Sequence, residues 1–429
     1  MRQILQPLMI IVLRKVTILD PGSPYHNSQK DILIDNGFIK QIDDSIDAAA
    51  DQIIDTKDCF VSQGWIDVFA NFCDPGFEYK ETLETGAAAA CAGGFTHVFV
   101  IPDTQPAISG KAQVEYIVQR SKSLPVDIHP LGAISRQLEG KELAEMYDMY
   151  NSGAVAFSDG LHAVQSAGLM LKALQYIKAF DGVLVTVALD KTVGRHGLMN
   201  EGIISTRLGL PGAPAIAEEL MIARDIELVK YTASKLHFTG VSTAKGLQLI
   251  SDAKQQGLPV TCSVTPYHLL FCDEDLQNYD TNLKVNPPLR TREDMIALRN
   301  AVSEGAVDCI ASHHMPQDWD NKVCEFEYAK AGMIGLQTSY ASVQTALPDL
   351  STERIAALYT TKAQEIFGLK QASIAEGNAA CLTIFNRHMT TTLTKEENKS
   401  KSSNSPFLDK PLNGKVIGII HKGRLHLNK

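Results

Sequence analysis

Four polar side chains follow short apolar runs of the chain and could combine into one hydrolytic site. They are Asp103, Asp159, His313 and His314. Carboxylates and imidazoles are zinc ligands, and zinc-bound water becomes a nucleophile near neutral pH. If the ends of the four runs meet in space, these residue types could support metal-assisted hydrolysis.

The pattern of the chain predicts the elements that would position these side chains. Short β-type runs alternate with helix-forming segments such as Glu81–Ala90 and Ile216–Asp225, which is typical of repeated βα units. We expect eight strands, at Trp65–Phe72, His97–Pro102, Val126–Ile134, Ala154–Ser158, Val183–Leu189, Leu236–Val241, Val260–Thr265 and Val307–Ser312. Eight such units predict an α/β fold of the (β/α)8 barrel type, with functional groups at the carboxyl ends of its strands.

Both ends of the chain show a different, β-rich pattern. From Val12 to about Phe60, β-type runs alternate with turns, and Asn36-Gly37 predicts a tight hairpin. Strand-like runs return after about residue 377, and the polar stretch Thr390–Ser405 has the composition of a mobile loop. We predict a small β domain from residues 1–60 and 373–429 beside a barrel domain of residues 61–372.

Composition limits the class of protein. The 429 residues are 45% hydrophobic and 21% charged, as in ordinary globular proteins, and the net charge of -9 argues against a nucleic-acid partner. The eight cysteines include no C-x-x-C pair, which favours a reducing compartment. The apolar stretch Leu5–Leu13 is interrupted by Pro7 and is expected to lead into a strand. We expect a cytoplasmic homo-oligomer without a membrane partner.

Several longer motifs resemble the dihydroorotases, the amidohydrolases that interconvert carbamoyl-aspartate and dihydroorotate in pyrimidine synthesis. The motifs are PGFEYKET at 75–82, MNEG and LGLPG within 199–212, YDTNLKVNPPLR at 279–290 and SKSSNSPF at 400–407. The resemblance spans nearly the whole chain. It implies an amidohydrolase-type barrel with a β-sandwich built from both termini, and it argues against disorder in the polar loop.

The resemblance also locates the metal ligands of the family, and most of them are replaced. The residues at these positions are Phe69 and Asn71 for the His pair of strand one, Val187 and Gly240 for the histidines of strands five and six, and His313 for the aspartate of strand eight. Phenylalanine, valine and glycine side chains offer no donor atom, and a carboxamide is a poor zinc ligand. We therefore expect no competent catalytic set and no cofactor, although active family members use zinc.

The substrate contacts that the resemblance implies are altered as well. The arginine that clamps the substrate carboxylate corresponds to Cys73, and an asparagine after strand two corresponds to Asp103, whose charge would repel an anion. Asn286 and His314 match family contact positions. The predicted remnant of the pocket comprises Cys73, Asp103, Asp159, Asn286, Arg290 and His314.

Each isolated candidate also has a structural interpretation. If a metal binds at all, the candidates are Asp159, which stands at the strand-four ligand position, His313 and His314. Asp159 is more often a capping or ion-paired carboxylate, His313 a pocket-filling ring and Cys73 an inert thiol. The remaining strand or loop histidines are expected to be packed and hydrogen-bonded: His129, His237 and His268.

Three functions follow from these observations. The leading hypothesis is a catalytically inactive dihydroorotase homologue that acts as a non-catalytic subunit or scaffold for aspartate transcarbamoylase. The second is an active cyclic-amide hydrolase with a rearranged metal site. The third is a metal-free protein that binds a small ligand through Asn286, Arg290 and His314.

Overall fold

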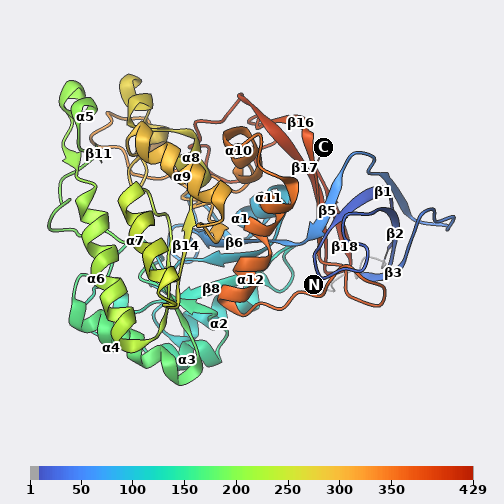
Figure 1. Cartoon of the computed structure of the whole chain (residues 1–429), viewed down its shortest axis with the longest axis horizontal. Coiled ribbons are helices and arrows are strands. Elements are labelled where there is room, and N and C mark those ends of the chain that lie inside the picture. The colour runs from blue at the N-terminus through green and yellow to red at the C-terminus, as the bar shows by residue number, and fades with distance from the viewer. Residues whose placement is uncertain (1–8, 429) are drawn as a thin grey trace.

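A barrel of short parallel strands forms the centre of the computed structural model, which describes residues 9–428 (Figure 1). The strands are hydrogen-bonded in the order β15-β14-β13-β10-β9-β8-β7-β6. Their bounds are β6 Trp65–Ala70, β7 Phe95–Val100, β8 Asp127–Gly132, β9 Ala156–Phe157, β10 Val183–Thr186, β13 Lys235–Phe238, β14 Val260–Val264 and β15 Cys309–Ile310. The predicted barrel is confirmed, with most strands shorter than expected.

A seam between β6 and the segment after β15 closes the barrel. Ala70 forms a parallel bridge with His314, whose carbonyl accepts the amide of Asn71 at 2.8 Å. Deeper in the seam, the buried carboxylate of Asp67 accepts the amide of Ser312 at 2.6 Å and its hydroxyl at 2.8 Å. Because candidate site residues flank these contacts, the seam determines where their side chains lie.

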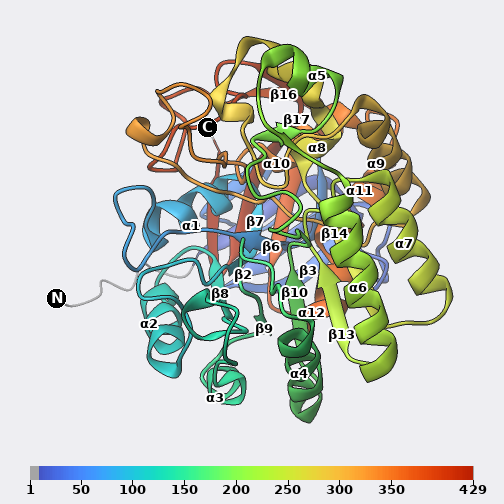
Figure 2. The same cartoon turned by 90° about the vertical axis from the view of Figure 1, so that its left-hand side faces the viewer.

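Helices surround the strands, as Figure 2 shows for α2, α3, α4, α6 and α7. The helices are α1 Leu83–Ala92, α2 Lys111–Ser121, α3 Met146–Asn151, α4 Ala167–Ile177, α5 Ile203–Leu208, α6 Ile216–Thr232, α7 Ala244–Gln255, α8 Pro266–Leu270, α9 Arg292–Glu304, α10 Ser339–Ala346, α11 Thr352–Tyr359 and α12 Thr361–Phe367. The helices predicted near residues 81–90 and 216–225 correspond to α1 and α6. Within residues 9–428, no helix has the length and apolar character of a membrane span.

Residues from both ends of the chain form one mostly antiparallel sheet beside the barrel (Figure 1). Its strand order is β18-β17-β16-β5-β1-β2-β3, and β4 pairs with β1. The bounds are β1 Ile10–Leu19, β2 Gln29–Asp35, β3 Phe38–Asp43, β4 Gln52–Asp55, β5 Phe60–Gln63, β16 Leu382–Thr392, β17 Pro411–His421 and β18 Arg424–Leu427. Asn36 and Gly37 form the β2–β3 turn with φ of 55° and 82°, as the hairpin prediction requires.

Two sequence expectations fall at the margins of this sheet. The apolar start at residues 5–13 lies only partly within the described chain, where β1 contains its last four residues. The domain boundaries at 60/61 and 372/373 stay predictions, and strand β5 runs to Gln63.

The polar segment at residues 390–405 is packed against the barrel, in contrast to the mobile loop that its composition indicates. Its first residues extend β16, and the side chains of Ser400, Ser402 and Asn404 are buried. Asn404 donates to the carbonyls of Met315 and Gly332, both at 3.0 Å. Short polar side chains are therefore structural here because they satisfy buried backbone groups.

Trp65 joins the sheet to the barrel. Its ring is fully buried, with centroids 5.0 Å from Tyr359, 5.1 Å from Phe385 and 5.2 Å from Tyr340. The indole N–H donates to the hydroxyl of Ser62 at 3.0 Å. One side chain thus contacts residues of β16, α10 and α11.

We predict that Trp65→Ala lowers the free energy of unfolding by about 3–5 kcal/mol, because it leaves a large cavity between the two units. Urea denaturation followed by circular dichroism measures this change. The matched control is Trp319→Ala, which removes the other tryptophan, 71% exposed, and should change the free energy by less than about 0.5 kcal/mol. Equal effects of the two substitutions would contradict the role assigned to Trp65.

Candidate functional site

The centre of the barrel mouth is filled by two stacked rings. Phe69 near the end of β6 and His313 after β15 are both buried, and their ring centroids lie 4.5 Å apart with an interplanar angle of 30°. Val187, which follows β10, belongs to the same buried cluster as Phe69. These residues occupy three of the positions at which the family resemblance places metal-binding groups.

His313 is held as a neutral ring by burial. Its Nε2 lies 2.9 Å from the hydroxyl of Thr239, and among the described residues no hydrogen-bond partner reaches its Nδ1. Burial lowers the pKa of His313 to about 3. The hydroxyl of Ser263 donates to Thr239 at 2.9 Å and also lies 3.0 Å from Nε2 of His237. A chain of hydroxyls and imidazoles thus lies behind the stacked rings.

Gly240 lies directly against the ring of His313. It follows β13 with φ of 68°, and a Cβ built on it would lie 2.5 Å from Cε1 of His313. A histidine at this position would therefore meet both a backbone conformation that favours glycine and a ring that already fills the space. The residues at positions 69, 240 and 313 form one packed arrangement.

The carboxylate of Asp159 is hydrogen-bonded to the loop that follows β8. It accepts the amides of Ile134 at 2.9 Å and Ser135 at 2.8 Å, and also the hydroxyl of Ser135. Burial raises the pKa of Asp159 to about 6, although these hydrogen bonds oppose the rise. This geometry is that of a capping carboxylate, because both oxygens of Asp159 accept hydrogen bonds from the loop after β8.

Asp103 lies beside Asp159 in an enclosed position. Its Oδ1 accepts the amide of Leu161 at 3.4 Å and lies 3.5 Å from Nε2 of His162, whereas its buried Oδ2 has no hydrogen-bond partner within residues 9–428. Burial raises the pKa of Asp103 to about 7, and the nearby charge of Asp159 adds to the rise. Gly160, with φ of 59°, provides the space for this carboxylate.

Asn71 and Cys73 also have local structural roles. The Oδ1 of Asn71 accepts the amide of Cys73 at 2.8 Å, which supports the φ of 59° at Cys73. Burial raises the pKa of the Cys73 thiol to about 12. Because only the thiolate is a good nucleophile or metal ligand, this cysteine is inert at neutral pH.

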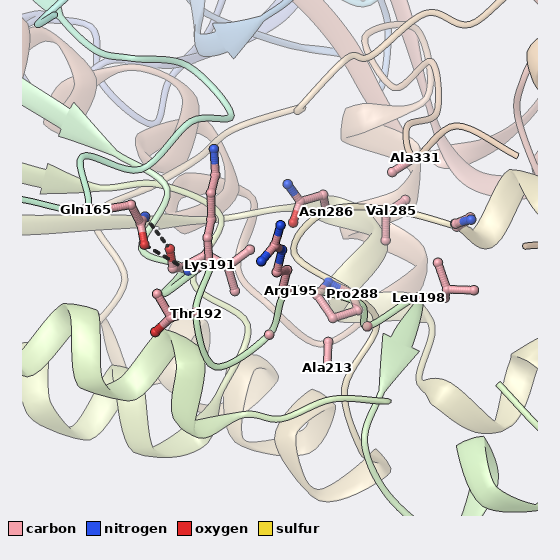
Figure 3. A pocket seen from close by; sticks show the side chains of 14 residues that line it. Gln165, Lys191, Thr192, Arg195, Leu198, Ala213, Val285, Asn286, Pro288 and Ala331 are labelled. Atoms are coloured by element: carbon pink, nitrogen blue, oxygen red, sulfur yellow. Dashed lines mark hydrogen bonds between the residues drawn. The ribbon is translucent and has the colours of Figure 1, made fainter. Parts of the chain in front are cut away.

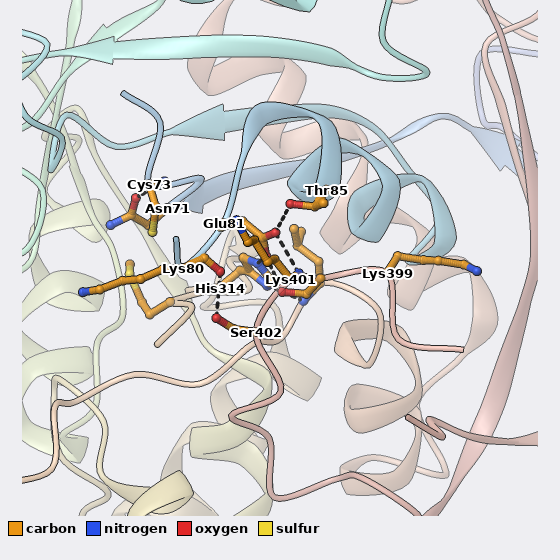
Figure 4. Close-up of polar contacts among 12 residues, drawn as sticks. Asn71, Cys73, Lys80, Glu81, Thr85, His314, Lys399, Lys401 and Ser402 are labelled. Carbon is orange, nitrogen blue, oxygen red and sulfur yellow. Dashed lines mark hydrogen bonds and ion pairs between the residues drawn. The ribbon is translucent and has the colours of Figure 1, made fainter. Parts of the chain in front are cut away.

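His314 belongs to a buried cross-link with Glu81 (Figure 4). Its Nδ1 accepts the amide of Gly335 at 3.1 Å, so Nε2 carries the proton and donates to Glu81 at 3.2 Å. The same carboxylate accepts the hydroxyl of Ser400 and, at 3.0 Å, the amide of Lys401. Glu81 thus ties together the segment before α1, the segment after β15 and the polar C-terminal segment.

Arg290 is likewise an internal residue. The residue is 2% exposed, and its guanidinium donates to the hydroxyl of Ser242 at 3.1 Å, the side-chain oxygen of Asn200 at 3.2 Å and the backbone carbonyl of Ala213 at 2.9 Å. Its Nη2 lies 3.9 Å from the buried carboxylate of Glu218. Of the three residues in the ligand-binding hypothesis, Arg290 and His314 therefore make internal contacts.

Asn286 lines a cavity of about 670 Å³ that lies between the loops that follow β10 and β14. Lys191 and Arg195 supply positive charge to its wall, and Figure 3 shows Arg195 beside Asn286. The Nζ of Lys191 lies 3.2 Å from Nδ1 of His162. The cavity is therefore suited to a small anion.

The residues at the mouth do not fit the catalytic zinc that the resemblance implies. The oxygens of Asp159 accept three hydrogen bonds, and His314 bonds to Glu81 and Gly335. Among the described residues of the mouth, Nδ1 of His313 and Oδ2 of Asp103 are left as buried donor atoms without a partner. A catalytic zinc needs three protein ligands around a common point and an open position. The mouth therefore falls short of such a ligand set.

The structure also identifies contributors that the sequence reasoning did not single out. In the sequence, Glu81 is the first residue of a helix-forming segment and part of the motif at 75–82, and neither pattern indicates that its carboxylate is buried. Lys191 and Arg195 lie in a loop without a recognisable pattern. Their proximity to Asn286 results from the neighbouring loops of the barrel and has no signature in the local sequence.

Comparisons with known proteins agree with this architecture. A family model described as dihydro-orotase-like matches residues 60–246. The chain is 36% identical to a dihydroorotase of Syntrophus aciditrophicus, over 97% of this chain and 99% of the relative. It is 39% identical to a dihydroorotase of Caldanaerobacter subterraneus subsp. tengcongensis, over 98% of each. The fold is similar to that of an L-hydantoinase (dihydropyrimidinase) from Arthrobacter aurescens, with a TM-score of 0.85, 23% identity, and coverage of 98% and 96% of the two chains.

We predict that Gly240→Ala lowers the free energy of unfolding by about 2–4 kcal/mol, because a methyl group both clashes with His313 and strains the backbone. Chemical denaturation measures the effect. Gly257→Ala is the matched control, since Gly257 also has positive φ, 76°, but nothing within 4 Å of its added Cβ. In a His313→Ala background the cost of Gly240→Ala should fall to that of the control. A cost unchanged in that background would show that the two positions are not coupled.

A second prediction concerns Glu81. Burial tends to raise its pKa, but hydrogen bonds from His314, Ser400 and Thr85 outweigh burial and the pKa is lowered. A lowered folded-state pKa contributes stability that is present above the unfolded pKa and is lost as pH falls through the folded pKa. Glu81→Gln should therefore destabilise the protein by about 2–4 kcal/mol at pH 7, with the difference shrinking below about pH 4.

Urea denaturation at pH 7 and at a pH below about 4 tests the role of Glu81. The matched control is Glu84→Gln in α1, which removes an exposed ion pair with Arg120 and should cost less than about 1 kcal/mol. A Glu81→Gln effect that stays constant with pH would rule out the ionised carboxylate as its source.

Proposed function

The chain belongs to the dihydroorotase family of amidohydrolases, and on that premise we propose that it serves pyrimidine biosynthesis as a non-catalytic member of the family. The observation that carries the proposal is the stack of Phe69 on His313 in the barrel mouth. This stack occupies the positions at which the family resemblance places metal-binding groups. Without a metal-bound hydroxide, attack on an unactivated cyclic amide at neutral pH lacks its nucleophile.

The proposed role is structural. A barrel that keeps its fold while its mouth is packed can still present the outer surface through which a family member assembles. We propose that this surface binds aspartate transcarbamoylase and that the protein acts as a non-catalytic subunit or scaffold in that assembly. Homo-oligomerisation in the cytoplasm belongs to the same proposal.

An active dihydroorotase is the second candidate. The relatives at 36% and 39% identity are named dihydroorotase, which favours catalysis in this chain as well. Such an enzyme would use a rearranged site drawn from His313, His314, Asp159 and Asp103. The cavity beside Asn286, with Lys191 and Arg195 in its wall, offers a place for an acidic substrate.

One assay separates the two candidates. The intact protein, produced with added zinc, is tested for dihydroorotate hydrolysis and for the reverse cyclisation, beside a dihydroorotase that keeps the His-x-His pair. We expect no turnover above the uncatalysed background. Turnover that His313→Ala abolishes would establish the enzyme and overturn the proposal.

The partner is tested separately. The tagged chain is co-expressed with aspartate transcarbamoylase from the same organism and analysed by affinity purification and size-exclusion chromatography. We expect the two proteins to elute together in a fixed ratio. A chain that elutes alone and monodisperse at micromolar concentrations of both would contradict the scaffold role.

A further inference from the structure

A group of metal-binding side chains lies at the end of the barrel opposite the mouth. His97 is in the first half of β7, Asp127 is the first residue of β8, and His421 is the last residue of β17. One potential ligand atom from each lies within 4.8 Å of the other two. The site joins the barrel to the sheet and shares no residue with the mouth.

We propose that His97, Asp127 and His421 bind a divalent transition metal of the zinc type. Ligand atoms about 2.0–2.2 Å from a tetrahedral zinc lie about 3.3–3.6 Å from one another. The Oδ2 of Asp127 is 3.7 Å from Nδ1 of His97 and 3.0 Å from Nε2 of His421. Small side-chain rotations therefore suffice to place all three around one ion.

Neighbouring groups orient the ligands. The Nζ of Lys422 lies 2.7 Å from Oδ1 of Asp127, which leaves Oδ2 directed at the two histidines. The Nε2 of His97 lies 3.8 Å from the sulfur of Cys381, which leaves Nδ1 as the ligand atom. Outer contacts of this kind fix ring orientation and tautomer in metal sites. His129 lies outside this group and contacts it through His97, with its Nε2 3.1 Å from Nδ1 of His97.

Hydrogen bonds within the group compete with a metal. The Nδ1 of His97 lies 3.1 Å from Nε2 of His129, so one of these nitrogens donates a hydrogen to the other when no metal is bound. The Nε2 of His421 likewise lies 3.0 Å from Oδ2 of Asp127. A bound metal must displace the protons shared in these two contacts.

The group is accessible from solvent on one side. The side chain of Asp127 is 38% exposed, whereas those of His97 and His421 are 12% and 8% exposed. An ion can thus enter past the carboxylate and lie between β7, β8 and β17. A metal bound there would stabilise the contact between the barrel and the sheet, because its binding free energy adds to that of folding.

The test uses the intact chain, stripped with a chelator and titrated with Zn²⁺ and with Co²⁺. We expect one equivalent of zinc per chain after gel filtration, a visible absorption band typical of tetrahedral cobalt, and a higher melting temperature with zinc. His97→Asn and Asp127→Asn should each weaken binding more than tenfold. His426→Asn, in the neighbouring strand β18 and outside the group, is the matched control and should bind as the wild type does.

The metal site does not rest on the proposed function, and the test distinguishes the failure of one from the failure of the other. Failure of the wild-type chain to bind either ion would overturn the metal site, even if a ligand variant fails to fold. Zinc that persists in His97→Asn but is lost in His313→Ala would overturn it too, and would place the ion in the mouth. Zinc lost in His97→Asn, with dihydroorotate hydrolysis persisting, would support the metal site and contradict the non-catalytic function.

Discussion

The hydrogen-bonded seam that closes the barrel is the constraint on which the arrangement of the mouth depends. The buried carboxylate of Asp67 holds the backbone and hydroxyl of Ser312, and two residues later His314 bridges to Ala70. Between these fixed points His313 adopts φ of 43°, a conformation that is uncommon outside glycine. The seam therefore turns one histidine ring into the barrel and directs the next toward Glu81.

The residues that pack the mouth depend on one another. The ring of His313 occupies space that a side chain at position 240 would need, and the ring of Phe69 covers its face. A metal-binding residue placed at one of the positions 69, 240 and 313 would still pack against the present side chains of the other two. Unpaired imidazoles and carboxylates in such a place carry a desolvation cost, whereas stacked and apolar groups stabilise the barrel.

The sequence predicts the architecture well because the apolar runs, helix formers and turns repeat with a clear period. The eight barrel strands, the Asn36-Gly37 hairpin and the joining of both termini into one sheet all follow from local pattern or from the family resemblance. Composition misrepresents residues 390–405, because hydroxyl and amide groups that look solvated are hydrogen-bonded to the mouth. The residues that meet across long sequence distances, such as Glu81 with Ser400 and Asp127 with His421, have no local signature.

The sheet that is completed by the far end of the chain has a consequence for synthesis on the ribosome. Strand β5 pairs with β1 on one side and with β16 on the other, yet β5 ends at residue 63 and β16 begins at residue 382. At about 5–20 residues per second, translation leaves that edge without its partner for tens of seconds. During this time one edge of β5 is unpaired, and an unpaired strand edge is a template for association with other chains. A sheet built from one continuous segment would pair its strands sooner after they emerge.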